Sequence, residues 1–216
     1  PDGRARFDLD TIRTFTTVEP LKEDQFLMAV TTESVPPGLY DVRLVIEQRG
    51  ADSVRRTGED TSGFAPAIAA QRGALVGLDS VEVPDPASSR LGLSDIILGR
   101  PGSGLTWTPP GGAPVPLNPL NAFPPGGTVA LYYQVSGLAP GARYRTDVSL
   151  APADDPKGRA VVTLSFTDRA ASRWTEVRRT VGLAQLKPGH YRLTVKVAGP
   201  NGETATRSGL VNIVKE

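Results

Sequence analysis

One stretch decides the fold expected for this chain: "SVPPGLYDVRLVIEQRG", residues Ser34–Gly50. A second copy, "QLKPGHYRLTVKVAGPNG", occupies residues Gln185–Gly202. In both copies a Pro-Gly pair is followed by a tyrosine, Tyr40 or Tyr191, and then by apolar residues at every second position. Proline presets the backbone of a turn, glycine adopts a positive φ without strain, and strict alternation indicates a half-buried strand. Each copy therefore predicts a sharp turn that leads into a β-strand.

The place of the tyrosine in each copy predicts a structural role. In immunoglobulin-like sandwiches a tyrosine beside such a turn donates a hydrogen bond to the backbone upstream, an arrangement called the tyrosine corner. We predict one corner at Tyr40 and one at Tyr191. A looser copy, "GLAPGARYRTDVSL", places Tyr144 after a similar turn and leaves its role open. The alternative for each copy is an ordinary tight turn beside a half-buried tyrosine.

Short alternating segments separated by turn residues make up most of the chain, which contains 23 Gly and 20 Pro. Alternation is present in residues 6–18 and 25–33 and recurs in six segments after residue 127, whereas only "FAPAIAAQRG" (Phe64–Gly73) is weakly helical. Such spacing is typical of antiparallel sandwiches. We predict an all-β protein with two immunoglobulin/fibronectin-III-like antiparallel β-sandwich domains in tandem, residues 1–87 and 88–216, divided within "VPDPASSR" (Val83–Arg90).

The charges are balanced, with 24 Lys and Arg against 23 Asp and Glu. Nucleic acids and anionic membranes select a basic excess, so we expect neither as the main partner, although a local basic patch stays open. The chain has no Cys, which excludes disulfides, thiolate metal sites and cysteine nucleophiles. No apolar run is long enough for a transmembrane segment.

The residues needed for catalysis or metal binding are sparse. The one histidine, His190, lies in the turn of the second copy, where we expect it to face solvent. Nucleophilic catalysis would need a histidine held between an acid and a nucleophile. The acids in "APADDPKG" (Ala151–Gly158) and "GEDTSG" (Gly58–Gly63) lack the spacing of a calcium loop. We therefore expect no enzyme activity, no cofactor and no metal site.

A long Pro- and Gly-rich loop, residues 99–127, reads "GRPGSGLTWTPPGGAPVPLNPLNAFPPGG". Long ordered loops in compact domains are usually functional, and proline-rich chain loses little entropy when it docks. Large side chains in such a loop are candidate interface anchors. The predicted partner-binding residues are Arg100, Trp107, Leu117, Leu120 and Phe123. The alternative, equally open, is that Trp107 and Phe123 fold onto their own sandwich.

Four segments in order, "VPPGLYDVRLVIEQ", "LGLSDIILG", "VALYYQVSGL" and "LKPGHYRLTVKVAGPNGETATRSGLVNI", carry a resemblance. They are similar to the C-terminal β-rich half of bacterial GWxTD-domain-containing proteins, and "LSDIIL" (Leu93–Leu98) is the most particular match. The Gly-Trp-x-Thr-Asp motif itself is absent, so no activity of that region is carried over. The resemblance implies an extracytoplasmic location, periplasmic or envelope-associated, and paired β-sandwiches.

Three functions remain open on this basis. The first is a non-catalytic structural or interaction protein of the bacterial envelope, an accessory subunit that docks on other proteins of a larger assembly, such as a membrane-bound respiratory or photosynthetic complex. The second is a carbohydrate-binding accessory module, which needs exposed coplanar aromatic rings; Trp107, Trp174 and a few tyrosines are available. The third, an enzyme, is disfavoured by the missing catalytic residues.

Overall fold

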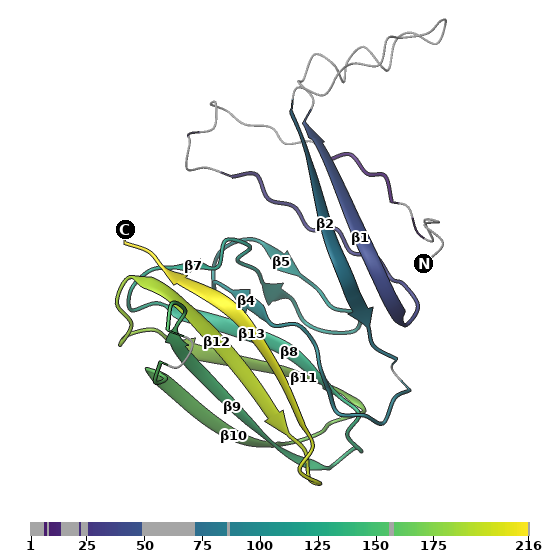
Figure 1. Ribbon diagram of the computed structural model, residues 1–216, viewed down its shortest axis with the longest axis vertical. Helices are drawn as coiled ribbons and strands as arrows, with labels where there is room; N and C mark the ends of the chain where they lie inside the picture. Colours follow the sequence, from purple (N-terminus) through teal and green to yellow (C-terminus); the bar gives the residue numbers. More distant parts are fainter. Residues whose placement is uncertain are drawn as a thin grey trace, which may run out of the picture. The chain divides into compact units, whose positions relative to one another are not determined.

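β-strands form all the regular structure of the described residues. The computed structural model describes residues 7, 9–13, 22, 26–48, 72–85, 87–155 and 158–215. Within these ranges there are thirteen strands and no helix, and so no helix able to cross a membrane (Figure 1). All strand pairings are antiparallel except that of β13 with β7. The predicted all-β, antiparallel class is confirmed.

The chain divides into two compact units. One consists of Val35–Asp85, and the other of Pro1–Ser34 together with Pro86–Glu216. The described part of the first unit is a hairpin of β1 (Gly38–Gln48) and β2 (Arg72–Val83). The hairpin register shifts between Tyr40 and Val42. Opposite this shift Ser80 has a positive φ of 59°, and its N–H donates to Asp41 Oδ1 at 3.2 Å, so the β-bulge is held by a side chain.

The second unit contains two sheets. The five-stranded sheet has the order β10-β9-β12-β13-β7, with bounds β7 Ala122–Phe123, β9 Arg143–Pro152, β10 Val162–Arg169, β12 Gly189–Ala198 and β13 Thr204–Ile213. The four-stranded sheet pairs β11 and β3 with β8, and β4 also pairs with β8; its bounds are β3 Gly92–Leu93, β4 Ile97–Gly99, β8 Thr128–Ser136 and β11 Trp174–Gly182. The short strands β5 (Thr106–Trp107) and β6 (Val115–Pro116) pair with each other.

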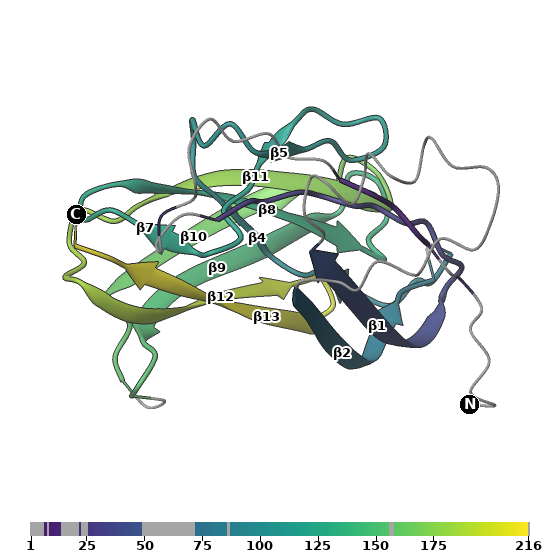
Figure 2. The same cartoon turned by 90° about the horizontal axis from the view of Figure 1, so that it is seen from above.

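Alternation along the long strands builds the core between these sheets. In β8, for example, Val129, Leu131, Tyr133 and Val135 are buried and point inward. The facing strands β9 and β12 contribute a matching set of buried residues, and all belong to one hydrophobic cluster. Figure 2 shows the two sheets as layers, with β5 outside the layer that contains β8 and β11. The second unit is therefore a β-sandwich.

Some expected elements differ from the structure. Residues 9–13 and 26–33 form no strand, although their sequence alternates. An alternating segment becomes a strand only where a neighbour completes its hydrogen bonds, and none does so in those two described ranges. Residues 6, 8, 14–18 and 25 and most of Phe64–Gly73 lie outside the described residues; Arg72 and Gly73 belong to β2. The first of the two predicted sandwiches is represented, in the described residues, by the β1–β2 hairpin.

Candidate partner-binding surface

The Pro- and Gly-rich loop, residues 99–127, is a folded segment that we call the arm. It enters from β4, and the Ser103 N–H donates to the Arg100 carbonyl at 3.1 Å to close a turn. The Ser103 hydroxyl donates to the Leu117 carbonyl at 2.9 Å and ties the two sides of the arm together. The β5–β6 pair follows, and the arm ends in β7, which joins the larger sheet beside β13. Each part of the arm is thus fixed by backbone hydrogen bonds.

The underside of the arm packs on the outer face of the smaller sheet. The Trp107 ring meets the Tyr132 ring edge-on, with centroids 5.7 Å apart and planes at 82°. The Arg178 guanidinium lies 5.3 Å from the Tyr132 ring centroid and donates to the carbonyls of Ala113 and Pro114 at 2.7 and 2.9 Å. Burial, followed by the charge of Glu176, raises the pKa of Tyr132. These contacts place Trp107 on its own sandwich.

The approach between the arm and β4 is close. A Cβ atom added to Gly99 would lie 2.0 Å from the carbonyl oxygen of Pro116. Val115, beside that proline, is almost fully buried. Only glycine fits at position 99, because the obstacle is backbone rather than a flexible side chain.

The predicted partner-binding role of Phe123 is wrong. Its side chain is 0% exposed and belongs to the core cluster of the sandwich. The cause is the pairing of β7 with β13, which sets Phe123 opposite Ile213 at the edge of the larger sheet. A residue buried in this way cannot contact a partner. For Phe123 and Trp107, folding onto their own sandwich is what the structure shows.

The other three predicted residues lie together. Arg100, Leu117 and Leu120 line one open depression of about 450 Å³. Met28, Leu105 and Pro119 also line it. Of these, Met28 lies outside the predicted loop, and no sequence motif links residue 28 to the arm. Leu120 is 47% and Met28 is 42% exposed. We call this depression the arm surface.

The arm surface is apolar with one cation. Arg100 is exposed, and none of the described residues that line the depression is acidic. The Asn118 side chain donates to the Ala122 carbonyl at 2.7 Å and holds the loop that presents Leu120. Asn212 of β13 donates to the Leu120 carbonyl at 3.4 Å. Leu120 is therefore exposed on a fixed backbone, which suits a binding surface better than a mobile loop would.

The two corner tyrosines make the hydrogen bonds predicted for them. The Tyr191 hydroxyl donates to the Lys187 carbonyl at 2.9 Å, and the Tyr40 hydroxyl donates to the Pro36 carbonyl at 2.7 Å. Each acceptor lies four residues upstream of its tyrosine. Both rings are partly buried, so these corners are more exposed than a core position.

Tyr144, in the looser third copy, has a different setting. It is 3% exposed and lies within the core cluster. Burial, followed by the negative charge of Asp168, raises its pKa to about 12. Asp168 of edge strand β10 pairs with Arg179 of edge strand β11, with Arg179 Nη2 at 2.6 Å from Asp168 Oδ2. This ion pair closes the side of the sandwich where both sheets end.

The residues considered for catalysis or metal binding include His190 and the acids of the loop after β9. His190 Nδ1 lies 2.7 Å from Asn212 Oδ1, the oxygen of an amide side chain. In the loop after β9 the Asp155 carbonyl accepts from the Gly158 N–H at 2.9 Å in a turn. The described residues contain no group of three histidines or carboxylates that could hold a metal ion.

Comparison with known proteins gives partial similarities. No family model and no curated protein matches the chain. One similar solved structure is a CARDB domain in complex with two metal ions from Pyrococcus furiosus, 12% identical, covering 63% of this chain and 100% of that one with a TM-score of 0.33. Another is a chain of the CaDoc0917–CaCohA2 complex, 16% identical, covering 43% of this chain and 94% of that one with a TM-score of 0.25. Both TM-scores are below 0.5, so neither similarity transfers a function to this chain.

Proposed function

We propose that this chain is a non-catalytic interaction protein whose arm surface docks on another protein. One observation carries the proposal: Leu120 is about half exposed on a segment fixed by hydrogen bonds, and Leu117, the half-exposed Met28 and a single cation line the same depression. Exposed apolar side chains grouped in a hollow are typical of sites that a partner covers. The sandwich below acts as the scaffold that positions this loop.

The composition of the arm surface limits the partner. Leucine and methionine side chains suit an apolar segment of another protein, and Arg100 suits an acidic residue beside that segment. We propose further that the partner belongs to a larger assembly of the bacterial envelope, such as a membrane-bound respiratory or photosynthetic complex, and that the chain acts there as an accessory subunit. The family resemblance and the absence of cysteine support an extracytoplasmic location.

The carbohydrate-binding alternative, in the form that needs a platform of aromatic rings, gains no support from the two tryptophans. Trp107 is packed edge-on against Tyr132, and Trp174 is partly buried at the start of β11. A sugar platform requires rings that present their faces to solvent. The arm surface remains the better-supported binding site.

The test compares two charge insertions. The protein, its Leu120→Asp variant and its Val161→Asp variant are each used to purify partners from native membranes. Val161 is the matched control because it is 44% exposed on the same unit but distant in sequence from the arm. We expect a stoichiometric partner that the parent and Val161→Asp retain equally and that Leu120→Asp binds at least tenfold more weakly. Equal retention by both variants, or no stoichiometric partner at all, would overturn the proposal.

A further inference from the structure

The outer face of the larger sheet is a surface separate from the arm. Alternate residues of β9, β10, β12 and β13 point away from the core, and strand register places them side by side. The inward residues of the same strands, such as Val148 and Val195, are fully buried. We call the outward positions of these four strands the cationic face.

Positive charge is concentrated on this face. Its outward positions include five exposed cations: Arg143, Arg145, Arg169, Arg192 and Lys196. Asp147 is the single acid at the outward positions of the four strands, all of which the structure describes. The whole chain is balanced, with 24 cationic and 23 acidic residues. The excess on one sheet is therefore a local feature of the surface.

Register arranges the cations in a line. Arg143 lies opposite Arg169, Arg145 opposite Ala198, and Lys196 opposite Asp147. Arg192 lies four residues from Lys196 along β12, opposite Ala151. At about 3.4 Å per residue the line from Arg143 to the level of Arg192 spans roughly 27 Å. Such a track fits an extended charged chain better than it fits a small ion.

Hydroxyl groups fill the space between the cations. Thr163, Ser149, Thr194 and Ser208 lie in register across the four strands. The Thr194 and Ser208 hydroxyl oxygens are 2.9 Å apart. Hydroxyls donate and accept hydrogen bonds, so a row of them suits a ligand that itself carries many hydroxyls.

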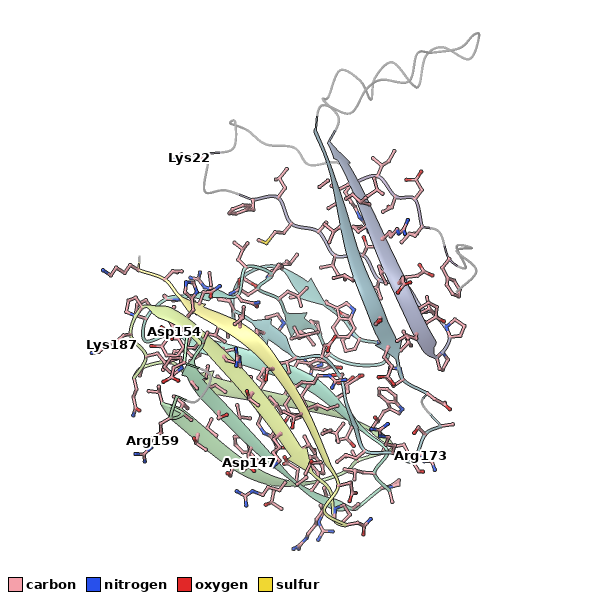
Figure 3. All side chains as sticks on the ribbon, in the orientation of Figure 1. Lys22, Asp147, Asp154, Arg159, Arg173 and Lys187 are labelled. Carbon is pink, nitrogen blue, oxygen red and sulfur yellow. The ribbon has the colours of Figure 1, made fainter. Side chains whose placement is uncertain are left out.

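The one acid on the cationic face, Asp147, already accepts hydrogen bonds from neighbouring side chains. Asp147 accepts from the Ser165 hydroxyl at 2.5 Å and from Arg145 Nε at 3.0 Å (Figure 3 labels Asp147 on the larger sheet). The Ser165 hydrogen bond holds the pKa of Asp147 below its usual value. The Arg145 side chain nevertheless stays 62% exposed. An exposed pair of this kind is weak, so Arg145 remains available to an anion.

We propose that the cationic face binds a linear acidic polysaccharide, with the arginines on its carboxylates and the threonine and serine hydroxyls on its sugar hydroxyls. The arginine fork matches a carboxylate with two parallel hydrogen bonds, and four of the five cations are arginines. An open sheet face suits a chain that lies along it. Binding at this site uses the cations and hydroxyls of the cationic face and does not depend on the arm surface.

The chemistry of the face favours a polysaccharide over two other polyanions. Proteins that settle on anionic membranes insert aromatic or leucine side chains, and on the outward positions of these described strands the one large apolar residue is Leu210. Single-stranded nucleic acids need aromatic rings for base stacking. None of the outward residues on these four strands is Phe, Trp or Tyr.

The experiment measures binding of the full chain to polygalacturonate, a linear polyuronate, by titration calorimetry. Dextran is the neutral polymer control, and phosphatidylglycerol vesicles and oligo-dT are the competing polyanions. The test variant is R145Q/R192Q/K196Q. The matched control, R13Q/R90Q/K215Q, removes the same charge from residues outside the cationic face and outside the arm surface. Both variants have the same net charge, so a difference between them reports position.

We expect polygalacturonate binding to weaken at least tenfold in the test variant and to change little in the matched control. Raising the salt concentration from 50 to 200 mM should weaken binding roughly ten- to hundredfold, because several ion contacts are lost together. Asp147→Asn should strengthen binding severalfold, which keeps the test decisive even if the triple variant is unstable. Equal binding by the two triple variants, tight binding of dextran, or preference for vesicles or oligo-dT would overturn the proposal.

Discussion

Removing the hydroxyl of Tyr191 tests how much its hydrogen bond stabilises the corner. Tyr191→Phe removes the donor to the Lys187 carbonyl while keeping the ring against the core. Because the ring is partly exposed, water can reach the freed carbonyl, and we expect a loss of about 1 kcal/mol in the free energy of unfolding. Urea denaturation followed by tryptophan fluorescence measures it. Lys187→Ala, which keeps the same carbonyl, is the control and should change stability by less than about 0.5 kcal/mol.

Tyr144 predicts how stability responds to alkali. Burial raises the pKa of Tyr144 to about 12, above the ordinary tyrosine value of about 10. A raised folded pKa means that the folded state keeps the proton more tightly, so this contribution is complete below pH 10 and is lost as the pH rises toward 12. The two-unit difference corresponds to about 3 kcal/mol. Denaturation at pH 8, 10 and 11.5 should show a steeper loss in the parent than in Tyr144→Phe; parallel curves would contradict the assignment.

At the scale of elements, the arm depends on its contact with β4. Gly99→Ala would bring a Cβ to within 2.0 Å of the Pro116 carbonyl oxygen, so β4 and the arm must separate. We expect a cost of about 1–3 kcal/mol, together with a red shift in Trp107 fluorescence as the ring leaves Tyr132. Gly182→Ala in β11 is the control, because its added Cβ would meet nothing within 4 Å. If both variants unfold alike, the arm is not held at this point.

An element can be predicted from the sequence when neighbouring residues determine it, and cannot when a strand far along the chain does. The corner at Tyr191 depends on a few consecutive residues, and the alternation of apolar and polar residues in the long strands β8 to β13 is visible in the sequence. Both features could therefore be predicted. The strands β5, β6 and β7 have two residues each, too few for any periodicity. The burial of Phe123 arises from pairing with Ile213, a partner far along the chain that no local pattern names. Residues 26–33 show the reverse case, alternation without a partner strand.

The same distinction holds for the candidate site. Arg100, Leu117 and Leu120 were predicted as separate members of a long loop, and folding of the arm brings them to one depression. The line of cations on the larger sheet could not be read from composition, because balanced totals conceal where the charges lie. Its arrangement follows from the register of four strands, which only the tertiary structure supplies.

For the molecule as a whole, we expect the sandwich to fold without residues 1–87, which include the first unit and the Pro1–Ser34 part of the second. A fragment from Ser88 to Glu216 contains β3 to β13 and every residue of the core cluster. We expect it to unfold cooperatively, as single domains of this size do, with the same Tyr191→Phe effect as the full chain. Differential scanning calorimetry of both proteins makes the comparison. An unfolded fragment beside a stable full chain would show that the two-domain division is wrong.

The place of β13 between β12 and β7 also has a consequence for synthesis. β7 leaves the ribosome first, but the strand it pairs with, Thr204–Ile213, is made about 90 residues later, which takes on the order of ten seconds at synthesis rates of about 5–20 residues per second. Until then Phe123 has no Ile213 to lie beside, and the arm is joined to the sheet at one end only. A ribosome that stalls before residue 204 would therefore release a chain with an exposed phenylalanine and an open sheet edge, the features that chaperones and proteases recognise.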